Sequence, residues 1–253
     1  MTSGSGNLGI ACLAGRGSPW NLETDVATSY GADLSIPSMY GEARQLIAAD
    51  PGKFAALSAI GLAPSWIASL IGGPFIVALI ILVVSLPIVA LANGALVVLV
   101  TMLRNGTTMP LKELLSGPRD GYMRLTLAYV LLSLILGAGF VLLVVPGLIA
   151  LTFLWVAWPL VVLEEANGID AVKRSAAIVD GYKLKITAII LVLVAIYIGL
   201  GVIQVMFAGI LGDAIGIAFG ALIGIAINAL ALTLVTLSYH RLKAAATSLA
   251  VVD

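Results

Sequence analysis

The stretch Pro146–Thr187, PGLIALTFLWVAWPLVVLEEANGIDAVKRSAAIVDGYKLKIT, contains each kind of segment from which this chain is built. An apolar run comes first, and two acids, Glu164 and Glu165, close it. A charged segment follows, and the corner Asp180-Gly181-Tyr182 leads into the next apolar run. We interpret this order as a membrane span, a surface helix, a corner and a second span. The rest of the chain follows the same order.

The composition of the whole chain indicates a membrane protein. Hydrophobic residues make up 61% of it, charged residues 10%, and the mean hydropathy is +1.13, whereas about a quarter of the residues of soluble proteins are charged. A soluble protein could not cover so much apolar surface with polar groups. The formal net charge is zero, so we expect no nucleic-acid partner. One cysteine and one histidine cannot form a disulfide or a thiolate or imidazole metal cluster, and we expect no cofactor.

The charge-poor runs predict six transmembrane helices. A bilayer core about 30 Å thick needs roughly 20 helical residues, and each long apolar run is about twice that length. We divide the runs at Gly72-Gly73-Pro74, at Pro146-Gly147 and near Asp213, because Gly and Pro favour turns. The predicted spans are 54–71, 75–103, 123–145, 148–163, 186–210 and 214–239.

Short amphipathic helices are predicted between the spans. The first begins near Ser38, with Glu42 on the side opposite its apolar stripe, and a helix ahead of Asp180 carries Lys173 and Arg174 beside its own stripe. The apolar stripe of the later helix is Ile169, Val172, Ala176 and Val179. Such a helix either lies in the plane of the lipid headgroups or packs on the protein's own bundle, and the sequence leaves both open.

The fold class that follows is an all-α polytopic membrane protein with six transmembrane helices in three hairpins, separated by short amphipathic cytoplasmic helices. Related corners at Asp50, Asp120 and Asp180 indicate a threefold repeat, although Asp-Gly is also common at ordinary turns. All 13 Lys and Arg residues fall on one side of the predicted spans. By the positive-inside rule that side is cytoplasmic, so we expect a bacterial inner-membrane protein with both termini inside.

The domain boundaries follow from the same patterns. Residues 1–37 are rich in Gly, Ser, Ala and Thr without a sustained period, which predicts a flexible tail. Their first 13 residues lack a basic start and a long apolar core, so we expect no secretory signal. Residues 38–246 are predicted to form the membrane domain, and residues 247–253 a short C-terminal tail.

The charged residues of the opening stretch are the first candidates for a functional site. Adjacent acids such as Glu164 and Glu165 can perform acid–base chemistry when their surroundings separate their pKa values, but no companion His or Cys is near them in the sequence. An ion pair or a headgroup contact is the favoured interpretation, and we expect no catalytic residue. The candidate headgroup or partner contacts are Glu164, Glu165, Lys173, Arg174, Lys183 and Lys185.

A second candidate feature is a stripe of small residues along the last span. Glycines recur there every four residues, a spacing that lets helix backbones approach closely. The stripe consists of Gly212, Gly216, Gly220 and Gly224, followed by Asn228. It predicts either packing within the bundle, which we favour, or a contact with a second copy. Asn93, Gln204 and Asn228 are polar residues within the spans, where they serve interhelical hydrogen bonds or line a polar path.

Several of these motifs resemble a known family. Pro146-Gly147 before an apolar span, Glu164 at its end, and then Ala171-Val172-Lys173-Arg174-Ser175 are similar to bacterial six-helix membrane proteins. That family includes the membrane domain fused to some glycerophosphodiester phosphodiesterases. The resemblance covers residues 38 to about 243 and implies fold and topology, but no catalytic residues. The phosphodiesterase activity belongs to a separate soluble domain, for which this chain is too short.

The expected function is therefore that of a non-enzymatic membrane protein. Its cytoplasmic basic residues would contact anionic headgroups, and the protein would organise or sense the bilayer or support a membrane-protein partner or a second copy. The alternative is a permease or export component that moves a small solute or peptide, including one that gives self-immunity.

Overall fold

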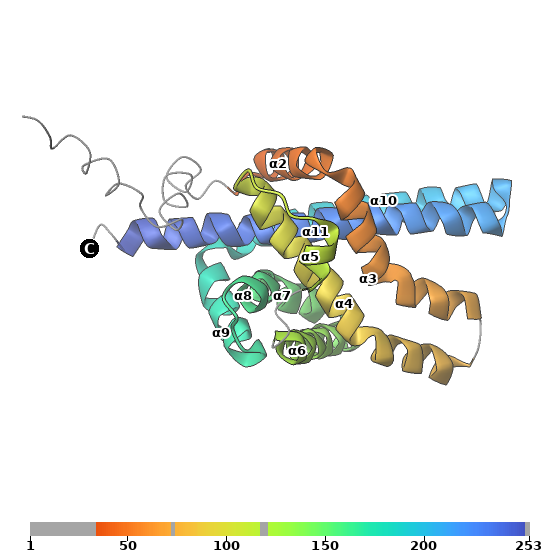
Figure 1. Cartoon of the computed structure of the whole chain (residues 1–253), viewed down its shortest axis with the longest axis horizontal. Helices are drawn as coiled ribbons and strands as arrows, with labels where there is room; N and C mark the ends of the chain where they lie inside the picture. Colours follow the sequence, from red (N-terminus) through yellow and green to blue (C-terminus); the bar gives the residue numbers. More distant parts are fainter. Residues whose placement is uncertain (1–33, 72–73, 117–120, 251–253) are drawn as a thin grey trace, which may run out of the picture.

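The computed structural model describes residues 34–71, 74–116 and 121–250, and most of the predicted N-terminal tail lies outside them. All the secondary structure in these ranges is helical, which confirms the predicted all-α class (Figure 1). The helices are α2 (Ile36–Ala49), α3 (Pro51–Ile71), α4 (Phe75–Arg104), α5 (Leu111–Ser116), α6 (Tyr122–Leu142), α7 (Val144–Phe153), α8 (Ala157–Leu163), α9 (Gly168–Val179), the 3-10 turn η2 (Asp180–Tyr182), α10 (Lys183–Leu211) and α11 (Asp213–Ala250).

Five helical stretches of the described chain are long and apolar enough to cross a membrane. They are Leu79–Arg104, Tyr122–Leu142, Val145–Leu163, Gly168–Leu211 and Ile215–Ala246. The segments Ile36–Ala49 and Pro51–Ala68 add a sixth only if they count together as one broken span, because they meet at a bend of 97°. These helices fit a polytopic membrane protein, the class that the composition predicts.

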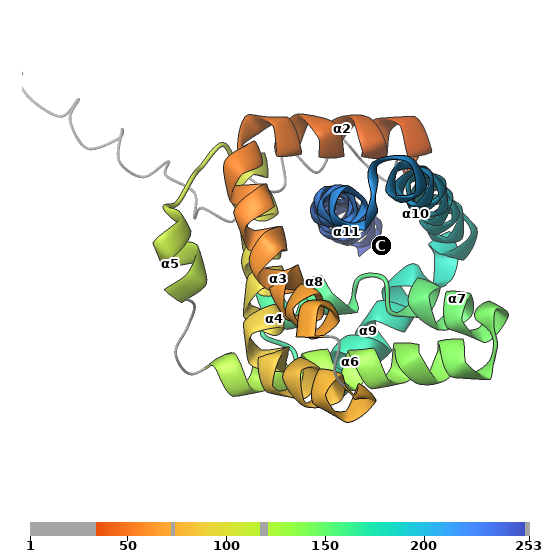
Figure 2. The ribbon, with the colours of Figure 1, turned by 90° about the vertical axis from the view of Figure 1, so that its right-hand side faces the viewer.

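Helix α11 occupies the centre of the molecule. Viewed along its axis, it is surrounded by α2 on one side, α6 on the opposite side, and the pairs α3–α4 and α7–α10 on the other two (Figure 2). It contacts α2, α3, α4, α8, α9 and α10. Its 38 residues make it the longest helix of those described. At 1.5 Å per residue it extends about 57 Å, well beyond a bilayer core of about 30 Å.

Consecutive helices form closely packed pairs, α3 with α4, α6 with α7, and α10 with α11. These pairs do not lie parallel to one another. Helix α6 runs across the axis of α10 and α11, which can be followed in two perpendicular views (Figures 1 and 2). In the first pair, α3 and α4 each bend along their length (Figure 1). Each contains an internal proline, Pro64 and Pro87, which removes a backbone hydrogen bond and kinks a helix.

The structure corrects the predicted boundaries of the second pair. The turn does not lie at Pro146-Gly147, because α6 ends at Leu142 and α7 already begins at Val144. Pro146 lies in the first turn of α7, where a proline disturbs no helical hydrogen bond. Gly147 packs against α6 so closely that a Cβ there would lie 2.5 Å from the Phe140 ring. The Pro-Gly signal therefore marks a close helix contact rather than the turn.

The predicted short span 148–163 is also divided. A turn at residues 154–156 separates α7 from α8. Around this break lies the main core, which includes Trp155, Val156, Ala157, Leu160 and Val161. Trp155 Nε1 donates a hydrogen bond of 3.0 Å to Ser238 Oγ on α11. Trp155 thus fixes the turn before α8 to the central helix.

The ends of the membrane domain differ from the prediction as well. Helix α11 continues to Ala250, beyond the predicted end of the last span at residue 239 and of the domain at residue 246. At the other end, Leu34 is buried and α2 begins at Ile36. The described fold therefore includes residues 34–37, which the sequence had assigned to the tail.

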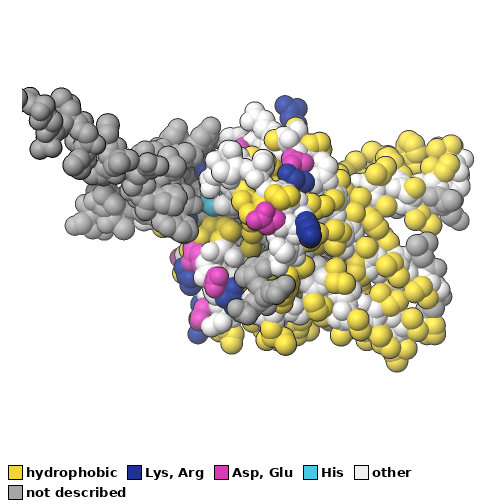
Figure 3. All heavy atoms as spheres, viewed as in Figure 1, with side chains coloured by type: hydrophobic (Ala, Val, Ile, Leu, Met, Phe, Trp, Pro, Cys, Tyr) yellow, Lys and Arg dark blue, Asp and Glu magenta, His cyan; other side chains and the backbone are white. Residues whose placement is uncertain are grey.

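Polar and apolar side chains are separated on the surface (Figure 3). Charged side chains gather near α2, α5 and α9. The halves of α3, α4, α10 and α11 that lie on the right in Figures 1 and 3 present an apolar surface. We call the first region the charged face. Its charged residues include Glu42, Arg44, Lys112, Glu113, Asp170, Lys173, Arg174 and Lys243, together with the buried Arg241. This separation is what a protein needs if one part is to lie in lipid and the other in water.

Candidate functional site

Three consecutive residues of α11 connect the central helix to three other parts of the charged face. Successive residues on a helix are separated by about 100° around its axis, since a turn takes 3.6 residues. Tyr239 reaches Glu164 after α8. His240 lies 3.0 Å from the Thr101 hydroxyl of α4, and Arg241 pairs with Glu42 of α2. The charged face is therefore organised around Tyr239, His240 and Arg241.

The first cluster surrounds Glu164. Tyr239 Oη donates to Glu164 Oε1 at 2.6 Å, and Lys243 Nζ lies 3.2 Å from the same oxygen. Arg174 of α9 pairs with the other carboxylate oxygen. Lys243 Nζ also donates to Tyr239 Oη at 3.2 Å. We call these four residues the Glu164 cluster, and they join α9 and α11 to the end of α8.

The Glu164 carboxyl is held in its charged form. Burial on its own would raise its pKa, but the hydrogen bond from Tyr239 and the charge and hydrogen bonds of its two cationic partners outweigh burial and lower it. A carboxyl with a lowered pKa is a poor proton donor or acceptor near neutral pH. The cluster is thus built for an ion pair, which is the favoured interpretation of the sequence.

The lowered pKa predicts how stability depends on pH. The Glu164 contribution is fully present above the unfolded-state pKa of about 4.3 and is lost as pH falls through the lower folded-state pKa. We expect the melting temperature of the detergent-solubilised protein to fall more steeply below about pH 4.3 in the wild type than in Glu164→Gln. Glu113→Gln, at an exposed position on α5, is the control and should keep the wild-type profile. An identical acid profile in Glu164→Gln would contradict the assignment.

The second cluster surrounds Glu42. The Arg241 side chain is only 1% exposed and pairs with the Glu42 carboxylate. Arg241 Nη1 also donates to Ser38 Oγ at 2.9 Å. Arg104 of α4 lies with its Nε 3.7 Å from Glu42 Oε1. These four residues, the Glu42 cluster, join α2, α4 and α11. The sequence pattern placed Glu42 opposite the apolar stripe of its helix, and the structure turns its carboxylate towards Arg241 of α11.

The remaining candidate residues are distributed along the charged face. Glu165 pairs with Arg124 of α6 at 2.9 Å. Lys183 pairs with Asp180 and lies 5.0 Å from the centre of the Phe153 ring. Lys185 lies 6.0 Å from the centre of the Tyr182 ring. Of the six predicted contact residues, the structure brings Glu164 and Arg174 together and keeps the other four outside that cluster.

Helix α9 packs on the bundle through a stripe that only partly matches the predicted one, since Val179 is buried and Val172 packs against the core but Ile169 does not. Its buried residues are Ala171, Ser175 and Val179, and Ser175 Oγ donates to the Phe153 carbonyl at 2.7 Å. Small side chains allow this close contact with α6, α7 and α8. Ile169, which was predicted to lie on the apolar stripe, is 61% exposed instead. Lys173 is also exposed, so the outer side of α9 carries both an apolar and a cationic group.

The glycine stripe contacts other helices of the same chain. A Cβ at Gly216 would lie 2.4 Å from Ala208 Cβ, and one at Gly220 would lie 2.2 Å from Gln204 Nε2, both on α10. Gly224 faces Leu62 of α3, with a corresponding distance of 3.4 Å. Gly212 has φ of +93° and ends α10, a backbone conformation that favours glycine. The stripe thus lets α11 approach α10 and then α3.

A few buried polar atoms have no hydrogen-bond partner within the described ranges. Among them are Ser58 Oγ on α3, Asn93 Oδ1 on α4 and Asn228 Nδ2 on α11. These three helices contact one another, and Asn93 Oδ1 lies 3.3 Å from the Cβ position of Gly61 on α3. Buried polar groups are normally satisfied by protein or by ordered water. The apolar bundle therefore has unused hydrogen-bonding capacity at this junction.

Neither a metal cluster nor a known relative assigns a function to this arrangement. Over residues 34–71, 74–116 and 121–250, no three His, Cys, Asp or Glu side chains are placed to hold a metal ion. Comparison with family models, with curated proteins and with solved structures finds no match to the chain. The charged face and the apolar surface are therefore the features that bear on function.

Proposed function

We propose that this chain is a six-span inner-membrane protein of bacteria whose charged face contacts anionic lipid headgroups. In this proposal the three helix pairs enter the bilayer as hairpins, with α6 and α7 strongly inclined to α10 and α11 as in the fold. Both termini are cytoplasmic, and the protein organises or senses the membrane or supports a partner in it. The resemblance to the six-helix bacterial family is part of the same proposal. The activity is a binding activity, not catalysis.

The observation that carries the proposal is the juxtaposition of exposed apolar and cationic side chains on the charged face. Leu184 is 87% exposed and stands between Lys183 and Lys185 at the start of α10. Ile169 and Lys173 are both exposed and lie one turn apart on α9. Exposing such leucine and isoleucine side chains to water is unfavourable. At a membrane surface they enter the acyl boundary while the lysines reach phosphate groups.

The ion pairs separate the cations that stabilise the fold from the lysines that remain available to lipid. Glu42 and Glu164 hold their cations within the protein, so those charges stabilise the fold. Lys173 and Lys185 instead project from the charged face as exposed side chains. Each basic residue near an anionic surface contributes about 1 kcal/mol of attraction. Two such residues thus supply a lipid preference without disturbing either cluster.

The test compares lipid dependence in the variant Lys173→Gln/Lys185→Gln. In nanodiscs, replacing phosphatidylcholine with phosphatidylglycerol is expected to raise the melting temperature of the wild type, and the double variant should lose most of that increase. Lys173→Arg/Lys185→Arg keeps the charge and should behave as the wild type. If the double glutamine variant retains the full increase, the headgroup role is wrong.

A permease or export component is the second candidate, and one observation favours it. The unpartnered atoms of Ser58, Asn93 and Asn228 lie on three helices that meet inside the bundle. A small polar solute would satisfy hydrogen-bonding groups of this kind. Uptake of a solute into proteoliposomes that is abolished by Asn228→Leu would favour transport over the headgroup role.

A further inference from the structure

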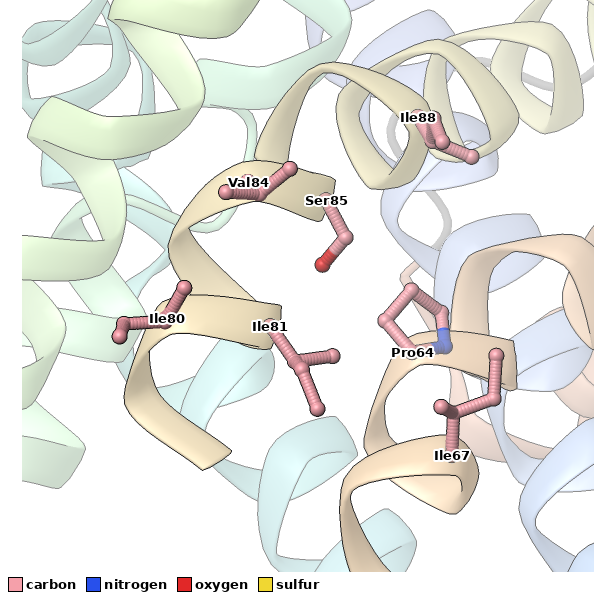
Figure 4. Close-up of a pocket in the computed structure, with 7 residues that line it drawn as sticks. All are labelled: Pro64, Ile67, Ile80, Ile81, Val84, Ser85 and Ile88. Atoms are coloured by element: carbon pink, nitrogen blue, oxygen red, sulfur yellow. The ribbon is translucent and has the colours of Figure 1, made fainter. Parts of the chain in front are cut away.

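A groove opens between α3 and α4 on the apolar part of the molecule. It has a volume of about 340 Å³. The side chains around it come from one short segment of α3 and one longer segment of α4 (Figure 4). They are Pro64 and Ile67 from α3, and Ile80, Ile81, Val84, Ser85 and Ile88 from α4.

The groove belongs to the exposed apolar surface of the molecule. Ile67, Ile80 and Val84 are all exposed, as are Ile71 and Ile76 near the connection of the two helices. In Figures 1 and 3 this half of the α3–α4 pair lies away from the charged face and is covered by apolar side chains. In the proposed topology the surrounding medium there is the hydrocarbon core, so whatever fills the groove comes from the bilayer or from another membrane protein.

The side chains of the groove offer no free hydrogen-bond donor to an occupant. Ser85 is its one hydroxyl residue, and Ser85 Oγ donates to the Leu82 carbonyl of its own helix at 2.9 Å. Pro64 has no N–H. A polar headgroup or a peptide backbone would therefore be left unsatisfied in the groove. A hydrocarbon chain carries no polar group and incurs no such penalty.

The size of the groove also limits the occupant. At about 30 Å³ for a group as large as a water molecule, this volume accommodates roughly ten such groups. That is part of one acyl chain and much less than a whole two-chain lipid. We propose that the groove between α3 and α4 holds one acyl chain of a bilayer phospholipid, seated against Pro64, Ile67 and Ile81. This inference goes beyond the headgroup role and depends only on the groove lying within the bilayer.

The first experiment uses the wild-type protein in phosphatidylcholine nanodiscs doped with a phosphatidylcholine that carries a photoreactive group on one chain. Neutral lipid is chosen because the headgroup proposal predicts no preference in it. After illumination and peptide mapping, adducts are expected to be enriched at residues 64–67 and 80–88 over the equally apolar Ile198 and Ile217 of α10 and α11. Equal labelling of both sets would overturn the proposal. A cross-link from the groove to a second copy of the chain would also overturn it.

The second experiment fills the groove. Ile81→Trp places a large side chain among the lining residues, whereas Ile198→Trp places the same side chain on the exposed surface of α10. In native mass spectrometry from mild detergent, we expect the wild type and Ile198→Trp to retain a phospholipid and Ile81→Trp to lose it. Retention by a folded Ile81→Trp protein would contradict the proposal. The labelling experiment decides the question if that variant does not fold.

Discussion

Replacing Arg241 with methionine is expected to destabilise the protein more than any other single change in the charged face. The Arg241 side chain is 1% exposed and joins α11 to Glu42 and Ser38. Removing one partner of a buried ion pair typically costs about 3–5 kcal/mol, because the remaining charge is left uncompensated. Arg104 stays 3.7 Å from Glu42, so we expect the lower part of that range. The measurement is the melting temperature in detergent.

A matched control and a second variant make this result interpretable. Arg44→Met changes the same residue type at an exposed position on α2 and should alter the stability by no more than about 0.5 kcal/mol. The double variant Glu42→Leu/Arg241→Met removes both charges and should recover part of the loss, since an apolar pair often replaces a buried ion pair without cost. An unchanged melting temperature in Arg241→Met would show that the Glu42 cluster contributes nothing.

Replacing Gly216 with leucine is expected to separate α10 from α11. A Cβ at this position would lie 2.4 Å from Ala208 Cβ and 2.9 Å from Ala208 Cα. The second distance involves backbone, so a rotamer change cannot relieve the clash and the helices must move apart. Overpacking of this kind costs about 1–3 kcal/mol and occasionally more. We expect a lower melting temperature and faster proteolysis at the α10–α11 connection.

The control for this variant is Gly209→Leu on α10. Outside its own helix backbone, no atom lies within 4 Å of a Cβ built at Gly209. Glycine inside a helix is about 0.8–1.0 kcal/mol less favourable than alanine, and leucine ranks just below alanine. That variant should be as stable as the wild type or slightly more stable. A Gly216→Leu protein that keeps its stability but loses a dimer would show that the stripe serves a second copy instead.

The sequence predicted the helical class and the separation of charged and apolar segments because both depend on composition and on short patterns. It placed turns less well. Pro146-Gly147 is a turn signal in most chains, but here the proline fits the first turn of α7 and the glycine accommodates Phe140. Whether a glycine serves a turn or a close contact depends on its partner helix, which no local pattern identifies.

The candidate site shows the same limit. Glu164 and Arg174 are 10 residues apart, and an ion pair here was one of the two interpretations of the sequence, beside a headgroup contact. Tyr239 lies 75 residues from Glu164, and Arg241 lies 199 residues from Glu42. Basic residues after a span ordinarily mark the membrane surface, and no local pattern shows that Arg241 is buried and pairs with Glu42. A local signal did exist, since the three successive polar residues Tyr239, His240 and Arg241 of α11 cannot all face one direction.

The contact between α2 and α11 limits when α2 can dock during synthesis of the chain. Ser38 and Arg241 are 203 residues apart, and ribosomes add about 5–20 residues per second. Helix α2 therefore leaves the ribosome roughly 10–40 s before its partner on α11 exists. During that interval Glu42 has no Arg241 to pair with, and α2 can dock only after α11 has been synthesised. Assembly at the charged face is thus completed by the last helix, whatever the order in which the earlier helices enter the bilayer.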